Sequence, residues 1–141
     1  MDRTRKLVHT LTEEQLHHAV APDKNRGIYL LGHLVAYHDA LGALMGLPHR
    51  TYPEWDAVFL HNPDQIGQAM PSVAELKTGW DTVHGRLASY FAQFTPAEWL
   101  IKHTAVTDEE FARQPHRNKL NVLLSRTNHL SYHLGQLVLL K

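Results

Sequence analysis

Residues 27–46 read GIYLLGHLVAYHDALGALMG, and this stretch decides the fold. It carries one formally charged residue, Asp39, among apolar, glycine and histidine positions. A helix that is apolar on nearly every side is buried by the rest of its protein. Gly46, with Pro48 two residues further on, is typical of a helix C-terminus. The stretch therefore predicts a central helix against which the other helices pack.

Seven prolines divide the rest of the chain, because proline ends or kinks a helix. Four long intervals lie between them, at residues 1–21, 23–47, 72–95 and 116–141. Residues 48–71 hold four of the prolines and predict one long irregular connection. No β-type alternation of apolar and polar residues is present. We therefore expect an all-α four-helix bundle with one long crossover connection, formed as a single domain over residues 1–141.

Local signals mark where several helices begin. Ser72-Val73-Ala74-Glu75 forms a capping box directly after Pro71, and Thr95-Pro96-Ala97-Glu98 repeats this pattern for a short helix. A further helical turn is expected after Thr107. Two apolar stripes at helical spacing are predicted to face the core. They are Val73, Leu76, Trp80, Val83, Leu87, Tyr90, Phe91 and Phe94, and then Leu120, Leu123, Leu130, Leu134, Leu137 and Val138.

Composition excludes several classes of function. Fourteen basic and fourteen acidic residues give a net charge of zero, so binding to nucleic acid is not expected. Without cysteine there is no disulfide and no protein thiolate, so any thiol chemistry uses an external thiol. Residues 127–140 form the longest run without a charged side chain, which is too short to cross a membrane. The N-terminus lacks the apolar segment of a secretory signal, and we expect a cytoplasmic protein.

Twelve histidines in 141 residues are the unusual feature of the composition. His129 and His133 lie four residues apart, on one face of the last predicted helix. Chance alone provides about one such pair at this histidine content, so the spacing is weak evidence by itself. Both side chains lie toward or beside the apolar face, where neighbouring imidazoles need partners. A metal ion would serve both, with His33 of the central helix as third ligand and His38 as the alternative.

Three neutral imidazoles suit Zn, Ni, Fe(II) or Cu and leave coordination positions open. We expect one divalent ion at the end of the core. Glu14-x-x-His17 resembles half of a di-iron motif, but the histidine-bearing helices contain no Glu, which excludes that site. His17 and His18 are expected at the surface. Protonation of all twelve histidines would move the formal charge from 0 to as much as +12, so solubility and stability should depend on pH between about 5 and 7.5.

Several other residues have open roles. Asp39 either orients an imidazole or faces solvent, Gln136 braces its helix by hydrogen bonding, and Gly135 permits a close helix approach. Arg126, one turn before His129, is a candidate for contact with an anion. Aromatic residues in the long connection are candidates for a lid or an interface. They are Tyr52, Trp55 and Phe59.

The chain resembles the DinB/YfiT-like superfamily. The resemblance rests on Gly32-His33-Leu34 in an apolar helix and on His129-x-x-x-His133-x-Gly135-Gln136-Leu137 near the C-terminus. It implies a four-helix bundle, a divalent transition metal held by three histidines, and frequent homodimers. By position, the metal ligands are His33, His129 and His133. Family members usually have a longer first helix before Leu11-Thr12-Glu13-Glu14, so here that helix is short or a partner subunit covers its side.

The resemblance also implies an activity. Some members resemble hydrolases or transferases that join bacillithiol, mycothiol or glutathione to an electrophile. We therefore expect a metal-dependent S-transferase or hydrolase-like enzyme that acts on a small molecule. The alternative is a non-catalytic helical dimer that acts as a metal-responsive or stress-responsive module or binds a protein partner.

Overall fold

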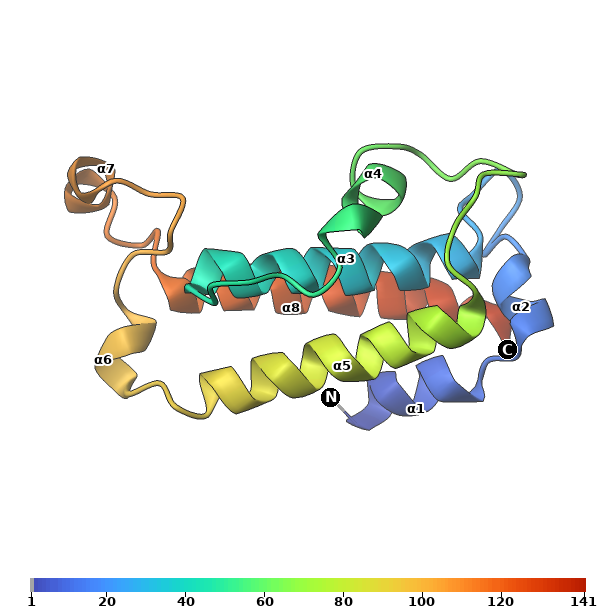
Figure 1. Ribbon diagram of the computed structural model, residues 1–141, viewed down its shortest axis with the longest axis horizontal. Coiled ribbons are helices and arrows are strands. Elements are labelled where there is room, and N and C mark those ends of the chain that lie inside the picture. The colour runs from blue at the N-terminus through green and yellow to red at the C-terminus, as the bar shows by residue number, and fades with distance from the viewer. Residues whose placement is uncertain (1) are drawn as a thin grey trace.

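The computed structural model describes residues 2–141, and these residues form helices without any strand (Figure 1). Three helices of 19 residues run along the molecule: α3 (Gly27–Met45), α5 (Val73–Phe91) and α8 (Lys119–Leu137). α3 packs against both of the others. The all-α prediction is confirmed.

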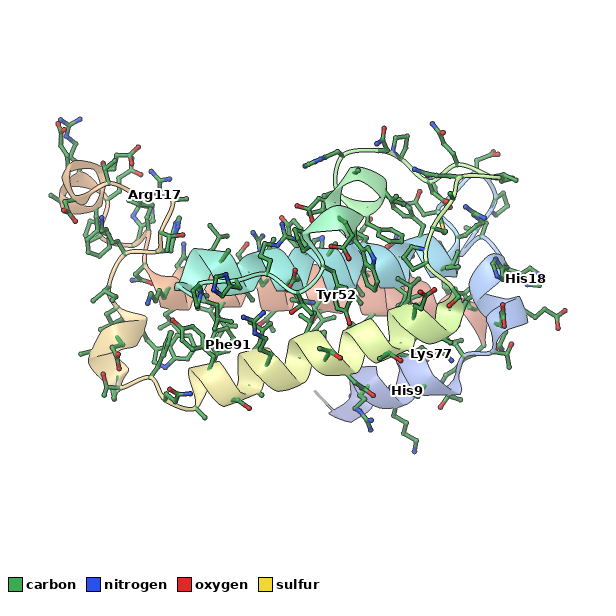
Figure 2. All side chains as sticks on the ribbon, viewed as in Figure 1. His9, His18, Tyr52, Lys77, Phe91 and Arg117 are labelled. Carbon is green, nitrogen blue, oxygen red and sulfur yellow. The ribbon has the colours of Figure 1, made fainter. Side chains whose placement is uncertain are left out.

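The first helical segment is much shorter than its neighbours. α1 (Asp2–Thr10) has nine residues and is followed by the single turn of α2 (Glu13–His17). α1 lies beside only one half of α5 (Figure 1). Arg5 forms a two-point ion pair with Asp81, and Lys77 Nζ donates to the Leu11 carbonyl at 2.6 Å, next to α1 in Figure 2. The other half of α5, beyond Asp81, has no comparable helix beside it within residues 2–141.

α3 is the central helix that its composition predicts. Most of its residues are buried, and it ends at Gly46, whose φ of +106° lies in the left-handed region that glycine adopts without strain. α3 is long and apolar enough to cross a membrane, but 72% of its most apolar 18-residue stretch is buried inside the protein. Here it therefore serves as the core helix.

The predicted capping boxes are present. Ser72 and Glu75 cap α5, Thr95 caps α6 (Pro96–Trp99), and Thr107 caps α7 (Asp108–Arg113). The first five residues of the predicted α5 stripe, Val73 to Leu87, are buried. The three aromatic residues that end the stripe are only half-buried, and they pack against one another and against Trp99.

The long connection after Pro48 is not wholly irregular. It contains η1 (Pro53–Trp55) and α4 (Asp56–Phe59), which lie over α3 (Figure 1). The Phe59 ring is fully buried against Gly32, where a Cβ atom would stand 2.2 Å from the ring. The absence of a side chain at Gly32 is thus what allows α4 to approach α3.

The predicted core stripe of the last helix is only partly correct. Leu123, Leu130 and Leu134 are half-buried and Leu137 is fully buried, but Leu120 and Val138 are exposed. Val138 in fact begins a short 3-10 turn, η2 (Val138–Leu140). α8 packs mainly against α3, whereas α1 packs against α5.

Candidate metal centre

Three imidazoles converge where α3 meets α8. His33 Nε2 lies 3.0 Å from His129 Nε2, which lies 3.1 Å from His133 Nε2. All three candidate ligand atoms lie within 4.8 Å of one another. Two nitrogens bound to the same zinc ion, each at about 2.0–2.1 Å, are roughly 3.3 Å apart in tetrahedral geometry. The spacing in the structure is therefore close to that of a metal site.

Hydrogen bonds orient two of these rings. His33 Nδ1 donates to the Phe59 carbonyl at 2.8 Å, and His133 Nδ1 donates to Gln136 Oε1 at 2.6 Å. Because the proton of each neutral ring is then on Nδ1, each Nε2 carries a lone pair. Such an outer hydrogen bond is what orients histidine ligands in metal proteins.

The donor set fits a cation better than it fits a hydrogen-bonded network. His33 Nε2 and His133 Nε2 both present lone pairs to His129, whose single Nε2 proton can be donated fully to only one of them. His129 Nδ1 is buried and has no hydrogen-bond partner among residues 2–141. A divalent ion at the centre would accept all three lone pairs and would place the His129 proton on Nδ1.

Electrostatics favour the neutral rings that a metal needs. Burial lowers the pKa of His33 from its ordinary value. Burial, together with the charges of His133 and His33, lowers the pKa of His129 to about 4. Both imidazoles are therefore neutral at pH 7 and are available as ligands.

Aromatic and cationic groups flank the triad on one side. The Tyr37 ring stacks on His33 at 5.4 Å and lies 4.3 Å from the His129 ring. The Arg126 guanidinium lies 3.9 Å above the Tyr37 ring. All three triad histidines are half-buried, so the site lies in a seam between α3 and α8 that solvent reaches.

His38, the alternative third ligand, does not join the triad. It is 4% exposed and faces α5, where its ring lies 4.8 Å from His84 and 6.2 Å from Trp80. His38 follows His33 by five positions on α3, so the two side chains point about 140° apart around the helix. The structure therefore brings together His33, His129 and His133, the set that the resemblance implied.

Two of three neighbouring residues, Asp39 and Gly135, differ from their expected roles. Asp39 neither orients an imidazole nor faces solvent; it is buried and accepts from the backbone N–H groups of Thr51 and Tyr52. Gln136 does form a hydrogen bond within its own helix, as expected, and its partner there is the His133 ring. The close approach expected at Gly135 is wrong, because nothing lies within 4 Å of the position of its Cβ.

Of the aromatic residues in the long connection, Phe59 is the one that contacts the triad. Phe59 is part of the core, and its carbonyl orients His33. Tyr52 stacks on Trp55 at 4.1 Å in front of α3 (Figure 2). The sequence did not predict that the Phe59 carbonyl accepts a hydrogen bond from His33. Every residue has a backbone acceptor, and no sequence pattern distinguishes this one.

The exposed N-terminal histidines agree with the surface role expected for them. His17 and His18 are exposed, as is Glu14, so the half di-iron motif has no inward-facing ligands. His17 lies 3.9 Å from Glu13 across one turn of α2.

An all-α fold in which two helices bring three histidines together defines the class: a helical protein with a candidate three-histidine metal centre. The family comparison is specific, because the model of the DinB superfamily matches residues 1–137. The chain therefore belongs to the DinB superfamily.

A solved structure supports the fold. The chain is similar to a conserved protein from Enterococcus faecalis, with 17% sequence identity and a TM-score of 0.65, over 99% of this chain and 86% of that one. At this identity the likeness concerns the fold alone. No curated protein matches the chain.

Proposed function

We propose that His33, His129 and His133 hold one divalent transition-metal ion, Zn, Ni or Fe, and that the protein is a metal-dependent enzyme acting on a small molecule. The observation that carries this proposal is the convergence of three Nε2 atoms within 4.8 Å in a half-buried seam. No fourth His, Cys, Asp or Glu joins the cluster among residues 2–141. Three protein ligands with an open position are typical of catalytic metal sites, whereas structural sites are closed.

The reaction we favour is transfer of a low-molecular-weight thiol to an electrophile. When bound, the ion supplies Lewis acidity that lowers the pKa of a thiol or water molecule at the open position. In thiol transfer, sulfur forms a bond to the electrophilic carbon, the leaving group departs with its electron pair, and the thiol proton passes to solvent. Hydrolysis of a small molecule is the second reaction to be tested. Because low-molecular-weight thiols are cytosolic reductants, we place the protein in the cytoplasm.

The protein's own residues prepare this site. The Phe59 carbonyl and Gln136 hold two imidazoles in the tautomer that leaves Nε2 free. The Tyr37 ring covers one side of His33 and His129 and limits the access of water there. Arg126, stacked on Tyr37, places a positive charge beside the site.

Metal content is the first test. Protein purified without a nickel column should contain roughly one equivalent of transition metal by elemental analysis. The double variant His129→Ala, His133→Ala should lose it. The matched control removes the two exposed histidines, His17→Ala and His18→Ala, and should retain the metal. Metal-free wild-type protein, or equal metal in the triad variant, would contradict the proposal.

Activity is the second test. The metal-loaded protein is assayed with bacillithiol, mycothiol and glutathione against a chlorinated nitroaromatic electrophile, and in parallel with small ester and amide substrates. Turnover that depends on the metal and is lost in the triad variant supports an enzyme. Absence of turnover with every thiol and every hydrolysable substrate favours the non-catalytic reading.

The non-catalytic reading, a helical homodimer that responds to metal or stress or binds a protein partner, has its own observation. One face of α8 and η2 exposes large apolar side chains, and Tyr132 and Leu139 are both 66% exposed. Such a face is typical of an interaction surface. Light scattering should give the mass of a dimer for the wild type and of a monomer for Tyr132→Glu. Thr82→Glu, exposed on α5, is the control.

A further inference from the structure

The structure also contains a cavity that is lined on α3 by His38 and not by His33. It has a volume of about 150 Å³ and lies between α3, α5 and α8, open to solvent on one side. His38, His84, Leu87, Phe91, Leu123 and Arg126 are among the residues that line it. None of the three triad histidines lines this cavity. The cavity is therefore separate from the three candidate ligands, although Arg126 borders both, because its guanidinium also stacks on the Tyr37 ring beside the triad.

The short α1 explains why this cavity is open. α1 contacts α5 through Arg5 and Asp81, and so covers only the half of α5 that precedes the cavity. The C-terminal half carries Phe91, labelled in Figure 2 where α5 faces α3 and α8. Leucine, phenylalanine and alanine side chains supply six of the ten lining residues, so the wall is largely apolar.

Besides His38 Nδ1, two polar groups at this cavity are buried without hydrogen-bond partners among residues 2–141. His84 is 7% exposed, and its Nδ1 donates to the Trp80 carbonyl at 2.8 Å. Its Nε2 therefore presents a lone pair, and it is buried without a hydrogen-bond partner among residues 2–141. Arg126 Nε is likewise buried and unpartnered, and the described residues place no carboxylate in an ion pair with this guanidinium. Buried polar groups in proteins nearly always have partners, so both point to a ligand.

We propose that this cavity binds a small aromatic carboxylate that also carries a hydroxyl group. The carboxylate matches the planar guanidinium of Arg126, the only charged side chain that lines the cavity within the described residues. The hydroxyl matches the Nε2 acceptor of His84. Arg126 belongs to α8 and His84 to α5, so two different helices supply the two polar contacts.

Size and charge exclude other ligands. A buried cavity of about 150 Å³ accommodates a benzene ring, and the open side here leaves room for short substituents. A nucleotide is too large, and an inorganic phosphate would leave the apolar walls unused. A second metal ion is disfavoured, because the Arg126 charge repels a cation. Burial also lowers the pKa of both His38 and His84, so both rings are neutral near pH 7 and only Arg126 attracts an anion.

Calorimetric titration with 4-hydroxyphenylacetate tests the proposal. Two comparison ligands each lack one group: phenylacetate lacks the hydroxyl, and 4-hydroxyphenylethanol lacks the carboxylate. The wild type should bind 4-hydroxyphenylacetate about 3- to 10-fold more tightly than phenylacetate. It should bind the same ligand about 10- to 100-fold more tightly than the alcohol, since that difference involves a charged hydrogen bond.

Two variants separate these preferences. Arg126→Gln should abolish the preference for the carboxylate and keep that for the hydroxyl. His84→Phe, which keeps a ring beside Trp80, should abolish the preference for the hydroxyl and keep that for the carboxylate. Arg113→Gln is the matched arginine control on α7 and should bind as the wild type does.

A further variant separates this proposal from the metal centre. His33→Ala breaks the triad but lies outside the cavity, so ligand affinity should be unchanged whether or not the metal hypothesis holds. Thermal unfolding of each variant confirms that it is folded, and Arg126→Met, which is also neutral, replaces Arg126→Gln if the latter is not. The proposal is overturned if no ligand binds at millimolar concentration, or if either preference persists after its partner residue is removed.

Discussion

His38 should make the stability of the metal-free protein depend on pH below neutrality. Its ring is 4% exposed and packs against His84 and Trp80. Burial, followed by the charges of His84 and His129, lowers the pKa of His38 to about 3. In the unfolded chain the same imidazole titrates near 6.5. Between these values the unfolded state binds a proton that the native state does not. The contribution of neutral His38 to the free energy of unfolding is therefore fully present above pH 6.5 and decreases as the pH falls below it.

The size of this stability loss follows from the pKa of His38 in the unfolded chain. At pH 5, protonation of His38 in the unfolded chain lowers the free energy of unfolding by about 2 kcal/mol relative to pH 7.5. The native pKa has little influence on this figure, because it lies well below 5. For a chain of this length, a loss of about 2 kcal/mol lowers Tm by roughly 6–8 °C.

Urea unfolding at pH 7.5 and pH 5.0, with a chelator present, measures this effect. The wild type should lose about 2 kcal/mol more than His38→Leu between the two pH values. Burial also lowers the pKa values of His33, His84 and His129, but their contributions are present in both proteins and largely cancel. His116→Leu, at an exposed position, should behave as the wild type does. Equal losses in the wild type and His38→Leu would refute the reasoning.

Three further substitutions test the packing and the metal centre. Gln136→Ala removes the group that orients His133 and should weaken metal binding about 10- to 100-fold in a competition titration; unchanged affinity would show that the hydrogen bond is incidental. Asp39→Ala leaves two backbone N–H groups and the Nε–H of Arg50 without this acceptor, although Arg50 keeps its ion pair with Asp56, and should cost about 3–5 kcal/mol in urea unfolding, whereas a loss below about 1 kcal/mol would contradict its anchoring role. Gly32→Ala places a methyl group against the Phe59 ring and should cost about 1–3 kcal/mol, with Gly135→Ala as the unhindered control.

The sequence alone determined the local boundaries of the helices. The hydrogen bonds that cap α5, α6 and α7 join residues three positions apart, at Ser72, Thr95 and Thr107. Gly46 likewise ends α3 by a conformation of its own backbone. Such features depend on neighbours in the chain, and so a pattern of residue types predicts them.

Which face of α3 meets which helix was decided only by the tertiary structure. α3 is apolar around its whole circumference, so no polar stripe indicates whether His33 or His38 faces α8. The resemblance to the family selected His33, and the structure gives the physical reason. α4 approaches α3 at Gly32, and its Phe59 carbonyl holds the His33 ring toward α8.

Long-range partners also arose only in the folded chain. Asp39 accepts hydrogen bonds from residues that follow it by more than ten positions, and the His84 ring contacts the His38 ring from another helix. The sequence determined that imidazoles and apolar helices were present in abundance. The fold decided which imidazoles share a centre and which line a cavity, because side chains far apart in sequence meet only after the helices have packed.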